Sequence, residues 1–124
     1  MEEKKVHSYR DLLVWKKGID LAKQLYSLTR GFPEDERFGL TIQIRRAGVS
    51  VPSNIAEGQA RRTTKEFIQY LHVAKGSLAE LDTQLTLAHL LGYLGEKAYK
   101  NLLEQIDVLQ RMLFNLIAKL GGSR

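Results

Sequence analysis

Apolar residues recur along this chain at steps of three and four, and no stretch alternates for long like a strand. One such seam, in residues 63–91, consists of Phe67, Leu71, Ala74, Leu78, Leu81, Leu85 and Ala88. A second seam, in residues 96–120, consists of Tyr99, Leu102, Ile106, Leu109, Leu113, Leu116 and Leu120. Seams with this spacing are typical of helices that pack nearly in line. The pattern therefore predicts helices over 63–91 and 96–120.

The first half of the chain predicts two more helices, over residues 8–29 and 34–57. The helix over 8–29, with Ser8 or Asp11 as its N-cap, has two apolar stripes, one of them Leu12, Trp15, Ile19, Ala22 and Tyr26. Two stripes give more apolar surface than one bundle contact needs, so we expect part of it to face another subunit. Between the two helices, Gly31 suits a C-cap, Pro33 suits a first turn, and three acids at 34–36 suit a positive helix N-terminus.

Short connections make sequential helices antiparallel. The sequence therefore predicts one all-α domain over residues 1–124, an up-down-up-down antiparallel four-helix bundle. Gly92 and Gly95 punctuate the turn between the last two helices. The helix over 96–120 carries further apolar residues on other faces, among them Phe114 and Ile117. That surface favours a homo-oligomer over a monomer.

Pro52 lies inside the predicted second helix. Leu40, Ile44, Ala47, Val51 and Ile55 keep the helical register past it, so we expect a continuous helix that is kinked at Pro52 and ends at Gly58. A proline ring presses on the carbonyl four residues back, at a cost of about 3 kcal/mol. That carbonyl belongs to Gly48, which has no side chain. The alternative is a break at residues 49–51, with Ser50 or Asn54 capping a short extra helix.

Several small and polar residues in the middle helices indicate packing rather than chemistry. Gly48 and Gly76 lie near the middles of their helices, where close approach between backbones would offset the cost of glycine. Polar residues also lie on or beside the apolar stripes. We interpret them as a structural polar network, with Glu80 or Glu57 pairing with Arg46; its members are Asn54, Glu57, Glu80 and Gln84.

The chain carries a net charge of +5, which permits a polyanionic partner. Most of the excess falls in residues 41–75, which hold six basic and two acidic residues, whereas 76–124 hold five of each. The alternatives are a merely solvated face and a phosphate-binding surface. The candidate contacts are Arg45, Arg46, Arg61, Arg62 and Lys65. No aromatic residue interleaves these arginines in sequence, so base stacking is not indicated.

The residues for other chemistry do not occur in the required patterns. There is no cysteine, and none of His7, His72 and His89 follows a glutamate by three residues, as a di-iron bundle site requires. No glycine pattern forms a phosphate loop, and no serine has a plausible histidine–carboxylate pair. We expect no catalytic residues, metal or cofactor. The N-terminus lacks the apolar core of a signal peptide, so we expect a cytoplasmic protein.

Three segments carry a family resemblance: LLVWKKGIDLAKQLYSLTRGFPEDERFGL, IRRAGVSVPSNIAEG and GSLAELDTQLTLAHLLGYL. Over residues 9–120 the chain resembles the four-helix-bundle 23S rRNA intervening-sequence protein family, to which accessory variability proteins of diversity-generating retroelements are structurally related. The resemblance implies a homopentamer that encloses a central channel, a basic surface for RNA or DNA, and no enzymatic activity. Five copies would together carry a charge of about +25.

Two functional hypotheses follow. The first is a non-enzymatic homo-oligomer that binds RNA or DNA through phosphate contacts, without preference for a nucleotide sequence. The alternative is an accessory subunit or scaffold that docks a partner protein such as a reverse transcriptase. The first rests on the basic excess in residues 41–75. In the second, the channel or rim of the oligomer would dock the partner.

Overall fold

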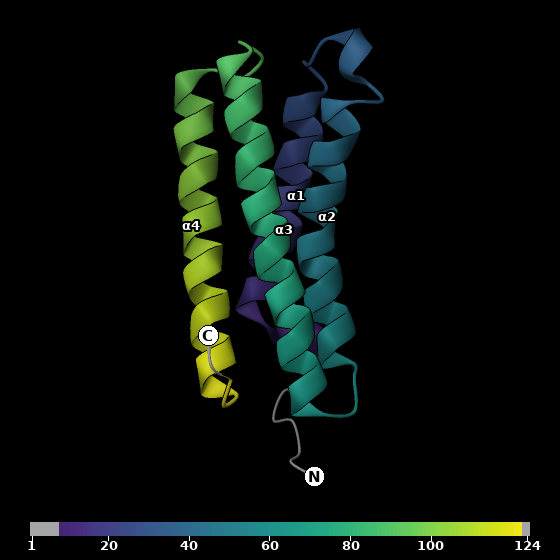
Figure 1. Cartoon of the computed structure of the whole chain (residues 1–124), viewed down its shortest axis with the longest axis vertical. Helices are drawn as coiled ribbons and strands as arrows, with labels where there is room; N and C mark the ends of the chain where they lie inside the picture. The colour runs from purple at the N-terminus through teal and green to yellow at the C-terminus, as the bar shows by residue number, and fades with distance from the viewer. Residues whose placement is uncertain (1–7, 123–124) are drawn as a thin grey trace.

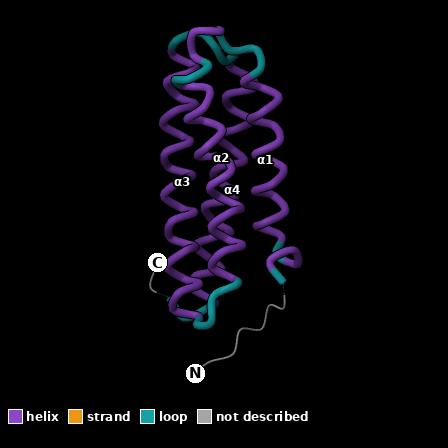
Figure 2. Tube along the Cα trace, turned by 90° about the vertical axis from the view of Figure 1, so that its right-hand side faces the viewer, coloured by secondary structure: helices purple, strands orange, loops and turns teal. Residues whose placement is uncertain are grey.

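The computed structural model describes residues 8–122, which form four long helices and no strand. The order is η1 (Tyr9–Asp11), α1 (Leu13–Thr29), η2 (Glu34–Glu36), α2 (Leu40–Gln59), α3 (Thr64–Leu90) and α4 (Glu96–Lys119), where η marks a short 3-10 turn. The helices run up and down side by side (Figure 1). The α1–α2 and α3–α4 connections lie at one end, and the α2–α3 turn lies at the other (Figure 2). The predicted all-α four-helix bundle is confirmed.

The first helix begins five residues later than predicted. Ser8 caps the separate turn η1, accepting a hydrogen bond from the backbone N–H of Arg10 at 3.2 Å, and α1 starts only after Leu12. Leu12 has extended backbone angles and no side-chain oxygen with which to cap α1. The prediction of Ser8 or Asp11 as the cap of this helix is therefore wrong, although the apolar stripes that follow are helical as expected.

The second helix also begins later than predicted, at Leu40 instead of residue 34. The acids at 34–36 form η2, and Gly39 then leaves the helical region, with φ −112° and ψ −112°. Glu36 still serves the helix from outside, because its Oε1 accepts the backbone N–H of Leu40 at 3.0 Å. The expected role of an acid at this N-terminus is thus filled by Glu36 across a bent connection.

The second helix runs unbroken through Pro52, so the alternative of a break at residues 49–51 is wrong. The kink at Pro52 stays a prediction. Small residues let α1 approach this helix closely: a Cβ on Gly18 would lie 3.4 Å from Pro52 Cβ, and one on Gly48 would lie 2.5 Å from Leu25 Cδ1. Close approach at Gly48 is therefore confirmed.

Two glycine predictions fail. Gly58 does not end α2, which continues to Gln59; it is buried inside the helix, where an added Cβ would lie 2.6 Å from Tyr70 Cβ on α3. Gly58 is thus a packing residue between α2 and α3. Gly76, expected at such a contact, is exposed on α3 with nothing within 4 Å of a built Cβ.

The core lies along the axis and contains the predicted seam of α3 and the middle of the seam of α4. Ile117, expected on another face of α4, is fully buried, whereas Leu116 and Leu120 are half-buried. Phe67 is fully buried, as are the leucines of α3 at 71, 78, 81 and 85. Gly92 ends α3 with a left-handed φ of 85°, and the N–H of Tyr93 bonds back to the carbonyl of Ala88 at 2.9 Å. Gly95 is the N-cap of α4 as predicted. The α3–α4 hairpin is therefore the part that the sequence pattern anticipated most closely.

Candidate nucleic-acid interface

Basic residues gather at the end of the bundle that contains the α2–α3 turn. The beginning of α1, the end of α2, the start of α3 and the end of α4 all lie there (Figure 1). Segments 8–18, 53–72 and 110–122 hold eight basic and three acidic residues, whereas 19–52 and 73–109 hold eight basic and nine acidic. The first set of segments therefore carries a net +5 and the second set a net −1. We call the first set the basic end; its basic residues are Arg10, Lys16, Lys17, Arg61, Arg62, Lys65, Arg111 and Lys119.

Arg62 and Lys65 are two exposed members of the predicted set of contacts. Arg62 lies in the α2–α3 turn and Lys65 in the first turn of α3, and both are exposed. Between them Thr63 caps α3: its Oγ1 accepts the N–H of Glu66 at 3.1 Å and donates to Glu66 Oε1 at 2.9 Å. The cap fixes the backbone from which both basic side chains project.

Arg61 stands beside these two residues in a different environment. Its Nη2 donates to Glu57 Oε2 at 2.9 Å and to the hydroxyl of Tyr70. The guanidinium lies over the Tyr70 ring, 4.9 Å from the centroid. The arginine is therefore held in one position by a carboxylate one turn earlier and by an aromatic residue of the next helix.

The first arginine pair splits, as the structure places its members on different sides of α2. Arg45 is half-buried: its Nε donates to Thr29 Oγ1 at 2.9 Å, and its guanidinium lies 4.5 Å from the centroid of the Tyr26 ring. It joins α2 to α1. Arg46 is exposed. Arg45 is thus occupied by packing, and Arg46 lies outside the basic end.

The predicted polar network is only partly assembled. Asn54 donates to the carbonyl and Oγ of Ser50, and Ser50 shares a hydrogen bond of 2.8 Å with Ser77 of α3. Glu57 instead pairs with Arg61, so the expected pairing with Arg46 is corrected. Glu80 is exposed, while Gln84 is buried and its Oε1 has no hydrogen-bond partner among the described residues. The network that links α2 to α3 is Ser50, Asn54 and Ser77.

A family model, the 23S rRNA-intervening sequence protein, matches residues 10–115. The chain belongs to the 23S rRNA-intervening sequence protein family. It is also similar to a protein of unknown function from the S23 ribosomal protein family of Bacteroides thetaiotaomicron VPI-5482, solved at 1.70 Å. That similarity has a TM-score of 0.76 and 23% sequence identity, and it covers 85% of this chain and 98% of the other. It shows a shared fold. No curated protein matches the chain.

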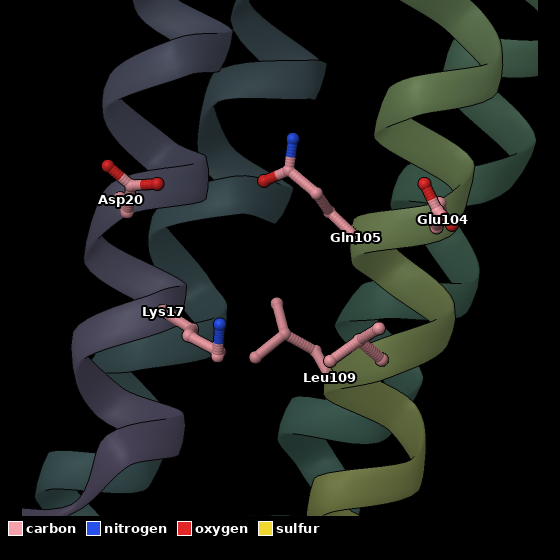
Figure 3. Close-up of a pocket in the computed structure, with 6 residues that line it drawn as sticks. Lys17, Asp20, Glu104, Gln105 and Leu109 are labelled. Carbon is pink, nitrogen blue, oxygen red and sulfur yellow. The ribbon is translucent and has the colours of Figure 1, made fainter.

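This member of the 23S rRNA-intervening sequence protein family has a surface hollow between α1 and α4. Figure 3 shows Gln105 and Leu109 of α4 pointing toward α1, and Lys17 of α1 pointing back. Gln105 exchanges two hydrogen bonds with Gln24 across the hollow, at 3.0 and 2.9 Å. Asp20 and Glu104 also line it, which makes its net charge negative. The hollow is therefore a poor place for phosphate, unlike the basic end.

At the far end of the bundle, η2 consists of three acidic residues. Glu36 Oε2 accepts a hydrogen bond from the Tyr93 hydroxyl at 3.0 Å. This bond, together with partial desolvation and the nearby charges of Glu36 and Asp35, raises the pKa of Tyr93 above its usual value near 10. The end opposite the basic end thus carries negative charge at the α1–α2 connection.

Sequence reasoning missed two parts of the interface. It missed the basic residues of α1 and α4, because they are distant in sequence, although an up-down topology places both helix ends beside the α2–α3 turn. It also missed Tyr70, because the expectation that no aromatic residue accompanies the arginines considered sequence neighbours only. Tyr70 lies nine residues after Arg61 and reaches it through the antiparallel packing of α2 and α3.

Two further findings concern residues 8–122 alone. No group of three or more histidine, cysteine, aspartate or glutamate side chains in this range could hold a metal ion. None of its helices has the length and apolar character needed to cross a membrane. His7, one of the three histidines considered as metal ligands from the sequence, lies outside the described residues.

Proposed function

We propose that this protein is a non-enzymatic, homo-oligomeric nucleic-acid-binding protein whose basic end contacts phosphates. The observation that carries the proposal is the separation of charge along the bundle, +5 at the basic end against −1 elsewhere. Cations that project together neutralise neighbouring phosphates and release counterions, which drives binding without reading sequence. The family's name connects its members with 23S rRNA, so RNA is the first ligand to test.

Self-association would strengthen this binding. Ile19 and Tyr26 of α1, and Ile42 and Val49 of α2, are exposed, and each pair is spaced by two helical turns on one face. The helices α1 and α2 pack closely, with Arg45 of α2 over the Tyr26 ring; we call these four apolar residues the α1–α2 strip. A second copy that covers the strip would remove it from water. In a cyclic assembly whose axis runs along the bundles, such as the pentamer that we favour, every basic end would lie on the same side.

The experiment compares two double variants that lose the same charge. Arg62→Ala/Lys65→Ala removes exposed cations of the basic end, and Lys97→Ala/Lys100→Ala removes exposed cations of the far end. Binding to single-stranded RNA and duplex DNA is measured across a salt series. We expect the first variant to bind about tenfold more weakly at 0.1 M salt, and the second to bind like wild type. Equal affinities of the two variants would refute the proposal.

Exposed apolar residues at the far end favour a second candidate, a scaffold that docks a protein. Phe38 is 85% exposed and Leu90 is 76% exposed. A docked partner would cover such side chains at the end away from a bound nucleic acid. The test is retention of a protein encoded by a neighbouring gene after nuclease treatment. Phe38→Ser/Leu90→Ser should abolish retention and leave RNA binding unchanged, and retention by this variant would refute the docking site.

A further inference from the structure

Arg61, at the basic end, has both a carboxylate and an aromatic ring against it: Glu57 Oε2 lies 2.9 Å from its Nη2, and the Tyr70 ring lies beneath it. The two charged side chains remain 40% and 56% exposed. A solvent-accessible pair can exchange partners, whereas a buried pair cannot do so without a large desolvation cost.

A carboxylate and a phosphate present similar oxygens to a guanidinium, which binds either through paired N–H donors. Glu57 therefore occupies a position that a phosphate can take. An accessible ion pair across one helical turn is worth about a factor of two in an equilibrium constant. An ion pair this weak lets a phosphate replace Glu57, but the contact between Glu57 and Arg61 must break before Arg61 can bind the phosphate.

Resting on the proposed nucleic-acid binding, we propose that Glu57 is an internal phosphate mimic that holds Arg61 ready and lowers affinity for nucleic acid. Tyr70 is a positioning residue: its ring and hydroxyl keep the guanidinium at the edge of the basic end while partners exchange. The ligand is a nucleic-acid backbone phosphate, which Arg61 binds beside the exposed Arg62 and Lys65.

The matched substitutions are Glu57→Gln and Glu80→Gln. Each removes one exposed carboxylate at nearly constant shape. Glu80 lies ten residues beyond Tyr70 on α3, about 15 Å along the helix and farther than the Debye length of about 10 Å at 0.1 M salt. The probe is a fluorescein-labelled oligouridine of about 20 nucleotides, and its affinity is read by fluorescence anisotropy.

We expect E57Q to bind the probe about two- to fourfold more tightly than wild type, and E80Q to bind like wild type. The gain must disappear when Arg61→Ala is added, because Glu57 acts through that arginine. Tyr70→Phe keeps the ring and loses the hydroxyl. It should weaken binding about twofold in the wild-type background and not at all in the R61A background, which a merely structural role would not produce.

The outcomes separate the inference from the proposed function. A wild-type protein that binds no RNA or DNA overturns the proposed function and the inference together. A protein that binds, but shows equal affinities for wild type and E57Q, overturns the inference alone. So does a gain from E57Q that persists undiminished in the R61A background, because the carboxylate would then act as general negative charge.

Discussion

Substitution of alanine for Gly58 and for Gly76 is the same chemical change and should have opposite effects on stability. Both glycines lie inside long helices, where alanine is favoured by about 1 kcal/mol. Gly76 is exposed, and nothing lies within 4 Å of an added Cβ. Gly76→Ala should therefore gain the full helical preference and stabilise the protein by about 1 kcal/mol.

Gly58→Ala meets the neighbouring helix. Its Cβ would lie 2.6 Å from Tyr70 Cβ and 3.2 Å from the carbonyl oxygen of Phe67. Neither atom can swing aside, because one is attached directly to the backbone and the other belongs to it. Overpacking of this kind costs up to about 3 kcal/mol, so the net effect after the helical gain is a loss of about 2 kcal/mol.

Thermal unfolding followed by circular dichroism measures the difference. For 124 residues the unfolding entropy makes 1 kcal/mol worth roughly 4 °C in Tm. Gly76→Ala should raise Tm by about 4 °C, and Gly58→Ala should lower it by about 8 °C. Protein concentration is held constant, because self-association adds to apparent stability. A Gly58→Ala protein as stable as wild type would refute the packing described for α2 and α3.

Two further predictions concern surfaces away from the basic end. Val49→Asp places a charge in the α1–α2 strip and should reduce the mass measured by light scattering to that of a monomer, whereas Val73→Asp, on an exposed face of α3, should leave it unchanged. A wild-type protein with the mass of a monomer would refute the proposed homo-oligomer. Glu36→Gln should lower the pKa of Tyr93 toward its usual value near 10, measured by ultraviolet titration as the difference between each protein and its Tyr93→Phe form. Because the folded-state pKa is raised, the stability that Tyr93 contributes is present below pH 10 and lost as pH rises through the folded value. Unchanged titration in E36Q would contradict the assigned cause.

Helical periodicity was sufficient for the number, order and core faces of the helices, because apolar seams are repeated over many turns. The connection before α2 was not predictable in the same way. Three acids and a proline suit a helix N-terminus wherever they occur, but the backbone of Gly39 decides that the helix starts only at Leu40. The sequence does not distinguish the roles of Gly58 and Gly76, because each role depends on which neighbouring side chain faces the glycine.

The candidate interface was predictable only in part. Arg61, Arg62 and Lys65 follow from their place near an expected turn, and the structure keeps them together. Arg45 does not belong with them, because it lies fourteen residues before the end of α2, about 21 Å along the helix, and its guanidinium packs on α1. The partnership of Tyr70 with Arg61 depends on how α2 and α3 align, which no local pattern specifies.

The central claim is that the basic end contacts nucleic-acid phosphates, and the salt dependence of binding tests it most directly. The slope of log affinity against log salt for duplex DNA should be about 1.8 smaller in magnitude for Arg62→Ala/Lys65→Ala than for wild type, since each lost phosphate contact removes about 0.9. The slope for Lys97→Ala/Lys100→Ala should equal that of wild type. An unchanged slope in the first variant, or a wild-type affinity that does not vary with salt, would contradict the account.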